Sequence, residues 1–153
     1  AIGQSLGMMH SLFKTYPDWA QIKLNGLAKN RTLRHRLTTI QKERWECKAL
    51  MAVTDILQQV NVADIDLLED GAQMVHGDMN NGNVLIDRTT KRPVVIDFED
   101  AATSWLSPLY DVAFIIQRFI FTKTNSCKQN LLESFIQGYR QENRIQASKR
   151  SDI

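Results

Sequence analysis

The sequence contains few of the features that mark disulfide-linked, zinc-binding or membrane-spanning proteins. Its two cysteines, Cys47 and Cys127, do not form a CxxC pair. They therefore predict neither a disulfide framework nor a zinc site, and they favour a reducing, cytoplasmic environment. Apolar runs such as 112–116 are far shorter than the roughly 20 residues that a membrane span needs. The sequence also has no basic stretch followed by an apolar one at its start, so we expect no membrane association.

An excess of charge of one sign is also missing. The chain has 19 basic and 17 acidic residues, which gives a formal net charge of +2. A balance this even does not favour nucleic-acid binding. With 153 residues, of which 43% are hydrophobic, the chain is long enough for one domain with a buried core.

Proline and glycine are scarce, and the stretches without them favour helices. Apolar residues recur at helical spacing over 2–14, and a second, short helix is predicted after Asp18. Gly26 weakens that second pattern, and a turn is expected near Asn30. The stretch 32–59 has neither proline nor glycine and is the longest helix that the sequence predicts.

The middle of the chain changes character and predicts strands. A short strand at 73–75 is followed by a loop rich in glycine and asparagine, and the apolar runs 84–86 and 94–96 form a hairpin. Such a hairpin places Asn83 and Asp97 at the same end. Ser107 and Pro108 then start a helix, as N-cap and first helical residue. A last helix carries Leu131 to Tyr139 before a polar tail.

Three of these polar residues have the chemistry of a phosphoryl-transfer site. Asp78 can serve as a base, and the oxygens of Asn83 and Asp97 can bind magnesium. The same residue types also form ordinary turns, and Asp97 alone could cap a strand end. Turn formation would not explain an aspartate directly after a buried strand, so the catalytic interpretation is preferred.

The motifs in order resemble those of one enzyme family. His76-Gly77-Asp78 with Asn83, then Asp97-Phe98-Glu99, within the segments 75–87, 94–101 and 107–113, are similar to the aminoglycoside phosphotransferase and choline kinase family. The resemblance implies an α+β, mainly α-helical fold, the C-terminal lobe of a protein-kinase-like enzyme. It implies this lobe over 1–140, with a polar tail over 141–153.

Roles follow from the resemblance position by position. It implies that Asp78 is the catalytic base and that Asn83 and Asp97 bind Mg²⁺. ATP or another nucleoside triphosphate would be the phosphoryl donor, and the acceptor would be the hydroxyl of a small molecule.

Four further residues receive supporting roles from the same resemblance. His76 and Asp111 would support the catalytic loop by hydrogen bonding, although Asp111 is also favourable at a helix start without any function. Glu99 and Asp100 fall where the family lines its substrate cleft, or they form a solvated surface. As substrate ligands, they would favour an amine-bearing acceptor.

The sequence departs from the family in two places. Asn80-Asn81 replaces a His-Pro pair that many members have. No GxGxxG loop is present, and Ala1 falls inside a helical pattern, so we expect that an N-terminal nucleotide-binding lobe belongs to the full-length protein and that this fragment alone is inactive.

Several functions share these motifs. An aminoglycoside phosphotransferase-like enzyme is the first interpretation, and choline, ethanolamine, thiamine, homoserine and sugar kinases are the alternatives. A catalytically inactive kinase-like binding domain also fits, and a metal-dependent hydrolase using Asp78, Asp97 and His76 is a more distant alternative.

Overall fold

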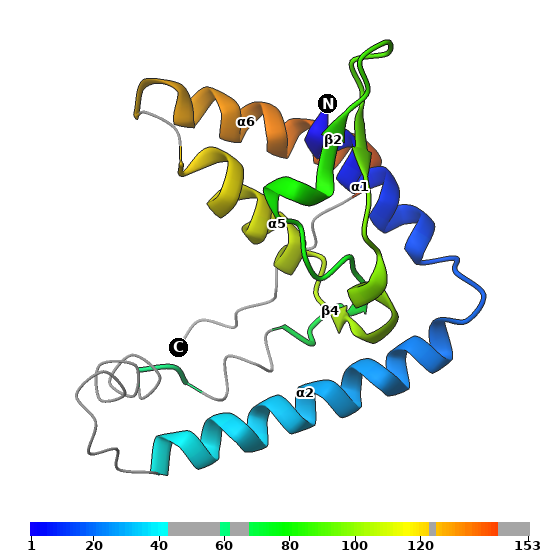
Figure 1. Cartoon of the computed structure of the whole chain (residues 1–153), viewed down its shortest axis with the longest axis vertical. Helices are drawn as coiled ribbons and strands as arrows, with labels where there is room; N and C mark the ends of the chain where they lie inside the picture. The colour runs from blue at the N-terminus through cyan, green and yellow to red at the C-terminus, as the bar shows by residue number, and fades with distance from the viewer. Residues whose placement is uncertain (43–58, 62–67, 123–124, 144–153) are drawn as a thin grey trace.

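Helices dominate the computed structural model of the chain, and two small antiparallel sheets accompany them (Figure 1). This architecture is compatible with the predicted α+β class. Within the residues that it describes, no helix is long and apolar enough to cross a membrane. The described residues are 1–42, 59–61, 68–122 and 125–143, with only the backbone given for 125–127.

Some sequence-based expectations fall outside these ranges. They are the portion 43–58 of the predicted helix 32–59, the environment of Cys47, the side chain of Cys127 and the end of the polar tail, 144–153.

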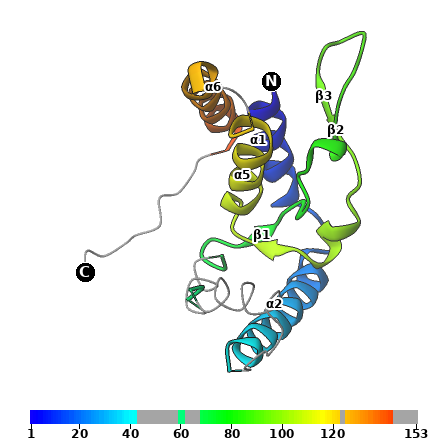
Figure 2. The same cartoon turned by 60° about the vertical axis from the view of Figure 1, so that its left-hand side comes forward.

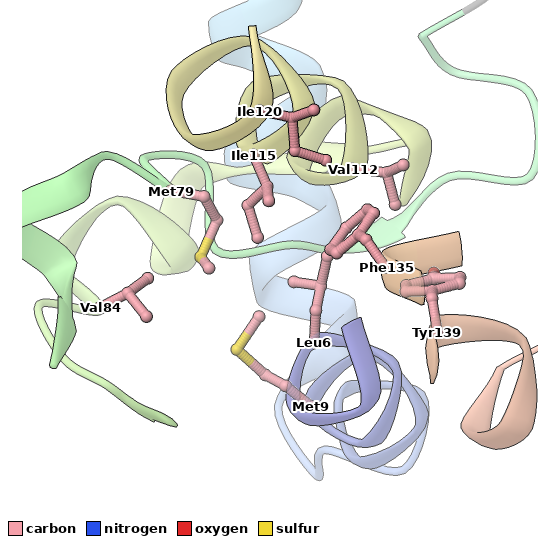
Figure 3. Packing of buried hydrophobic residues seen from close by; sticks show 9 residues of the cluster. All are labelled: Leu6, Met9, Met79, Val84, Val112, Ile115, Ile120, Phe135 and Tyr139. Atoms are coloured by element: carbon pink, nitrogen blue, oxygen red, sulfur yellow. The ribbon is translucent and has the colours of Figure 1, made fainter. Parts of the chain in front are cut away.

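The main core lies between three helices. The first is α1 (Ile2–Phe13), which ends one residue before the predicted stretch 2–14 does. It packs against α6 (Asn125–Glu142), and α5 (Leu109–Ile115) lies beside both (Figure 2). Their buried apolar side chains meet others from the central loop and hairpin, as Figure 3 shows for Leu6, Met9, Met79, Val84, Val112, Ile115, Ile120, Phe135 and Tyr139.

Two glycines let α1 and α6 approach unusually closely. A Cβ atom added at Gly3 would lie 2.0 Å from the carbonyl oxygen of Phe135, and one at Gly7 would lie 2.7 Å from that of Tyr139. Real Cβ atoms do not make such contacts, so any side chain at these positions would push the helices apart. The absence of two methyl groups therefore sets the distance between the two helix backbones.

The second helix differs from its prediction. Instead of a short helix, a turn and a new helix, α2 runs unbroken over Trp19–Lys42. Gly26 lies inside it, where an added Cβ would be 2.4 Å from the Cβ of Trp105. Asn30 is buried and donates to Glu69 Oε1 at 3.1 Å and to the carbonyl oxygen of Trp105 at 3.4 Å. Both residues that predicted an interruption thus serve tertiary packing within a continuous helix.

Two pairs of short strands position the central loop. β1 (Gln73–Met74) pairs with β4 (Trp105–Leu106), a pairing that the sequence pattern did not predict. β2 (Val84–Ile86) and β3 (Pro93–Val95) form the predicted hairpin, which projects away from the helices (Figure 2).

The segment after β4 begins close to where the sequence predicts a helix. Pro108 occupies the cap position and α5 starts at Leu109, whose N–H donates to Ser107 Oγ at 3.4 Å. The α-helical form ends at Ile115. It changes at Ile116 into the π-helical turn η3 (Ile116–Ile120), in which the N–H of Phe121 donates to the carbonyl oxygen of Ile116 at 3.0 Å.

The close contact of α1 and α6 predicts the effect of one added methyl group. In the full-length protein, we expect Gly3→Ala to lower the free energy of unfolding by about 1–3 kcal/mol, the usual cost of overpacking. Alanine is the better helix former by roughly 1 kcal/mol, so a loss must come from the contact itself. Thermal unfolding monitored by circular dichroism measures the change.

Met8→Ala is the matched control, because Met8 lies on the same helix with its side chain exposed. An unfolding midpoint for Gly3→Ala equal to or above that of the wild type would contradict the close approach of the helices.

Candidate active site

The predicted catalytic loop leaves β1 through a left-handed glycine. Val75 is fully buried and its N–H donates to the carbonyl oxygen of Ser104 at 3.1 Å. Gly77 then has a φ of 88°, and an added Cβ there would lie 2.4 Å from Ser104 Oγ. Glycine is needed on both counts, because other residues rarely adopt this φ and no space is left for a side chain. The turn directs the chain toward Asp78.

A buried carboxylate holds the start of this loop. Asp111, in the first turn of α5, is fully buried. Its Oδ2 accepts from the N–H of His76 at 2.8 Å, and its Oδ1 accepts from the N–H of Gly77 at 3.0 Å. A buried carboxylate is costly unless donors surround it, so these hydrogen bonds tie α5 and the loop to one geometry.

The His76 side chain connects the loop to the end of β3. The N–H of Asp78 donates to Nδ1 of His76 at 3.3 Å, so that nitrogen carries no proton. The proton is therefore on Nε2, which donates to the carbonyl oxygen of Ile96 at 2.9 Å. The neutral ring thus bridges the backbone of Asp78 and the residue before Asp97.

Two amide groups orient the carboxylate of Asp78. Asn83 Nδ2 donates to its Oδ2 at 3.1 Å and to its backbone carbonyl oxygen at 2.9 Å. Asn80 Nδ2 donates to the same Oδ2 at 2.8 Å, and Asn80 Oδ1 accepts from the N–H of Gly82 at 2.7 Å. In the part of the chain that the structure describes, Oδ1 of Asp78 accepts no hydrogen bond. The two oxygens of this half-buried carboxylate are therefore unequal.

The hairpin brings Asp97 next to Asn83. The N–H of Ile96 donates to the carbonyl oxygen of Asn83 at 3.0 Å, which extends the pairing of β2 and β3 by one step. Asp97 follows directly, with an exposed side chain and a φ of 65°. This left-handed conformation costs a non-glycine residue of the order of 1 kcal/mol, and aspartate is among the residues that tolerate it best.

The donor set at this place suits magnesium. Asp78, Asn83 and Asp97 offer carboxylate and amide oxygens, and Mg²⁺ is typically held by one or two carboxylates together with substrate phosphates and water. Among the described residues, no group of three or more His, Cys, Asp or Glu side chains could enclose a metal on its own. The set thus fits a metal that is held jointly by the protein and a nucleotide.

Glu99 and Asp100 follow Asp97 closely in the chain, and a Cβ added at Gly77 would lie 3.4 Å from Asp100 Cβ. Both belong to the 3₁₀ turn η2 (Glu99–Thr103). Lys29 Nζ lies 3.5 Å from Asp100 Oδ1, in an exposed pair, and also donates to Thr103 Oγ1 at 3.2 Å. In the described residues, Glu99 has no side-chain hydrogen bond, and its side chain is exposed. The sequence predicts the same role, as substrate ligands, for both acids. In the structure they differ, because Asp100 pairs with Lys29 and Glu99 makes no side-chain hydrogen bond within the described residues.

Tyr110 is a site residue that the sequence analysis did not single out. Burial raises the pKa of its phenol above the ordinary value, and the nearby carboxylates Asp111, Asp78 and Asp100 raise it further. The phenol therefore keeps its proton. The sequence signal that could have identified Tyr110 was its position directly before Asp111.

Three further contacts were also missed. Asn80 was seen only as a departure from the family motif, whereas its amide lies on the carboxylate of Asp78. His10 and Tyr139 both contact the Asp111 network from distant helices. A histidine among the apolar residues that α1 buries was the only sequence signal for this contact, since a polar side chain on a buried face needs a partner.

Comparison with known proteins agrees with the family resemblance. The model of the phosphotransferase enzyme family matches residues 1–145. Searches of curated proteins and of solved structures gave no significant match, so the assignment to a protein-kinase-like lobe stays a prediction. The family match covers the three helices of the core, the central loop and the hairpin, and on this evidence the chain belongs to the phosphotransferase enzyme family.

Proposed function

We propose that the full-length protein is a kinase that transfers the γ-phosphoryl group of ATP, or of another nucleoside triphosphate, to a hydroxyl group of a small molecule. The observation that carries this proposal is the meeting of three residues at one end of the hairpin. Asn83 is hydrogen-bonded to Asp78, and its backbone is paired with the residue before Asp97. A base and two metal-binding oxygens are what phosphoryl transfer requires of this half of an active site.

In this mechanism Asp78 is the general base. Its Oδ1 receives the proton of the acceptor hydroxyl, since Oδ2 is already occupied by the amides of Asn80 and Asn83. The acceptor oxygen forms a bond to the γ-phosphorus, the bond from that phosphorus to the β–γ bridging oxygen breaks, and the nucleoside diphosphate leaves.

Asn83 and Asp97 are the proposed magnesium ligands. When bound, the metal neutralises negative charge on the phosphate oxygens. Asn83 uses its Nδ2 group on Asp78, which leaves its Oδ1 as the ligand atom. The exposed carboxylate of Asp97 is accessible to a nucleotide-bound metal.

The exposed carboxylates of Glu99 and Asp100 favour an amine-bearing acceptor. Glu99 is exposed, and among the described residues the side chain that pairs with the carboxylate of Asp100 is Lys29. Glu69, another acid of the region, is engaged by Asn30 and by Arg34 at 3.1 Å, so its charge is largely neutralised. A panel of aminoglycosides, choline, ethanolamine, thiamine and homoserine, assayed with the full-length protein, distinguishes between the acceptors.

The base assignment predicts the effect of a single isosteric substitution. In the full-length protein, we expect Asp78→Asn to lower kcat by about 10²–10⁴-fold, because general-base catalysis contributes on this scale. Steady-state phosphoryl transfer from radiolabelled ATP measures the loss. Nucleotide binding by calorimetry, which we expect to persist, shows that the variant is folded.

Asp87→Asn is the matched control for this substitution. Asp87 lies outside the catalytic loop, in the turn of the hairpin of β2 and β3, where its carboxylate accepts from Thr90 Oγ1. We expect its activity to stay near that of the wild type. Undiminished turnover in Asp78→Asn would refute the base assignment, and a wild-type protein that binds magnesium nucleotide without turnover would be the inactive binding domain.

The contact of Asn80 predicts a smaller effect. Asn80→Ala removes one of the two amide donors to Asp78 Oδ2, and a hydrogen bond to a charged group contributes about 1.5–3 kcal/mol. We expect kcat to fall by roughly tenfold or more while KM for the nucleotide changes little.

Asn81→Ala is the control for Asn80→Ala, since Asn81 is the adjacent, exposed asparagine. Equal kinetic constants for the two variants would show that the bond from Asn80 to Asp78 has no part in turnover.

A further inference from the structure

The hydrogen bonds around Asp111 continue beyond the catalytic loop into two other helices. His10 of α1 and Tyr139 of α6 are 0% and 1% exposed. His10 Nε2 lies 3.0 Å from Asp111 Oδ2, and His10 Nδ1 lies 2.8 Å from the Tyr139 hydroxyl oxygen. The proposed function uses neither residue, yet both are connected through a single carboxylate to the backbone just before Asp78.

The direction of these hydrogen bonds follows from the phenol. Burial raises the pKa of Tyr139 far above its ordinary value, and the charge of Asp111 raises it further, so the phenol keeps its proton. Among the described residues, that proton has no acceptor other than His10 Nδ1. A buried hydroxyl proton without an acceptor is costly. Tyr139 therefore donates to Nδ1, and the proton of a neutral His10 is on Nε2, where it is donated to Asp111.

The carboxylate of Asp111 thus receives three donors from two segments of the chain, the helix α1 and the catalytic loop. Oδ2 accepts from His10 Nε2 and from the N–H of His76, and Oδ1 accepts from the N–H of Gly77. Since His10 lies at the end of α1 and Asp111 in the first turn of α5, the contact fixes the carboxylate against rotation. Each oxygen then stays opposite one peptide N–H of the loop.

We propose that His10 and Tyr139 are positioning residues for phosphoryl transfer. Tyr139 fixes the tautomer of His10, His10 fixes the orientation of Asp111, and Asp111 holds the two peptide groups that immediately precede Asp78. The inference rests on the proposed function, because it assigns these residues to the placement of the base.

Stability alone does not account for this buried polar chain. An apolar side chain at residue 10 would continue the buried face that Leu6 and Met9 form. Buried polar networks are often no more stabilising than apolar side chains of similar volume. The presence of such a network is explained if it specifies one geometry, which here is the geometry of the catalytic loop.

The test compares kinetic constants in the full-length protein. We expect His10→Leu, which keeps the volume but removes both hydrogen bonds, to lower kcat at least tenfold with KM for the nucleotide changed less than twofold. Tyr139→Phe should lower kcat about threefold to tenfold, because the tautomer is no longer fixed. His10→Gln, whose amide can still donate to Asp111, should recover most of the loss.

Matched controls are available on the surface. His35→Leu and Tyr16→Phe make the same chemical changes at exposed positions and should leave the kinetic constants unchanged. A kcat within twofold of the wild type in both His10→Leu and Tyr139→Phe would overturn the positioning role. So would a loss that His10→Gln does not reduce.

Two spectroscopic readouts test the inference without any turnover. In ¹⁵N-histidine-labelled protein, His10, assigned by its loss in His10→Gln, should show a protonated Nε2 and an unprotonated Nδ1. The amide protons of His76 and Gly77 should exchange at least tenfold faster in Tyr139→Phe than in the wild type.

These readouts separate two kinds of failure. A doubly protonated His10 ring, or unchanged amide exchange in Tyr139→Phe, would overturn the inference even if the enzyme is active. Absence of phosphoryl transfer by the wild type, with the expected tautomer and exchange, would refute the proposed function and leave the hydrogen-bonded connection standing.

Discussion

The arrangement of the central loop depends on one buried carboxylate. Asp111 is inaccessible to water, so its charge must be balanced by donors from the protein, and it obtains them from a helix on one side and from the loop on the other. The same requirement fixes where α1, α5 and the loop can lie relative to one another. The apolar core around Leu6, Ile115 and Phe135 packs the helices together, and apolar contacts specify geometry less strictly than directed hydrogen bonds do.

In this site, some polar side chains hydrogen-bond within the protein, and others remain accessible to substrate or metal. Both ring nitrogens of His76 are hydrogen-bonded to backbone groups. The side chain of Asn80 is hydrogen-bonded to Gly82 and Asp78. Asp97 is exposed and held in a left-handed conformation. The groups that are proposed to touch substrate or metal are therefore the few that the internal network leaves available.

The elements that local patterns encode were predicted well. The bounds of α1, the hairpin of β2 and β3, and the start of α5 follow, to within one or two residues, from apolar spacing and from residues such as Ser107 and Pro108. The family resemblance, carried by motifs within 75–113, is confirmed by the family match.

The elements that depend on distant partners were not predicted. Gly26 and Asn30 read as helix breakers because their partner, Trp105, is far away in the sequence. The pairing of β1 with β4 and the π-helical turn η3 likewise have no local signature. The same holds at the site, where His10 and Tyr139 are separated from Asp111 by many residues and become relevant only once α1 and α6 have packed.

The close crossing of α1 and α6 has a mechanical consequence. Where two helix backbones touch through Gly3 and Gly7, no side chains lie between them to rotate or to be compressed. The two helices therefore pack as one unit, with His10 on α1 and Tyr139 on α6. The separation of His10 and Tyr139, and with it the position of Asp111 next to the loop, thus depends partly on two residues whose side chains are single hydrogen atoms.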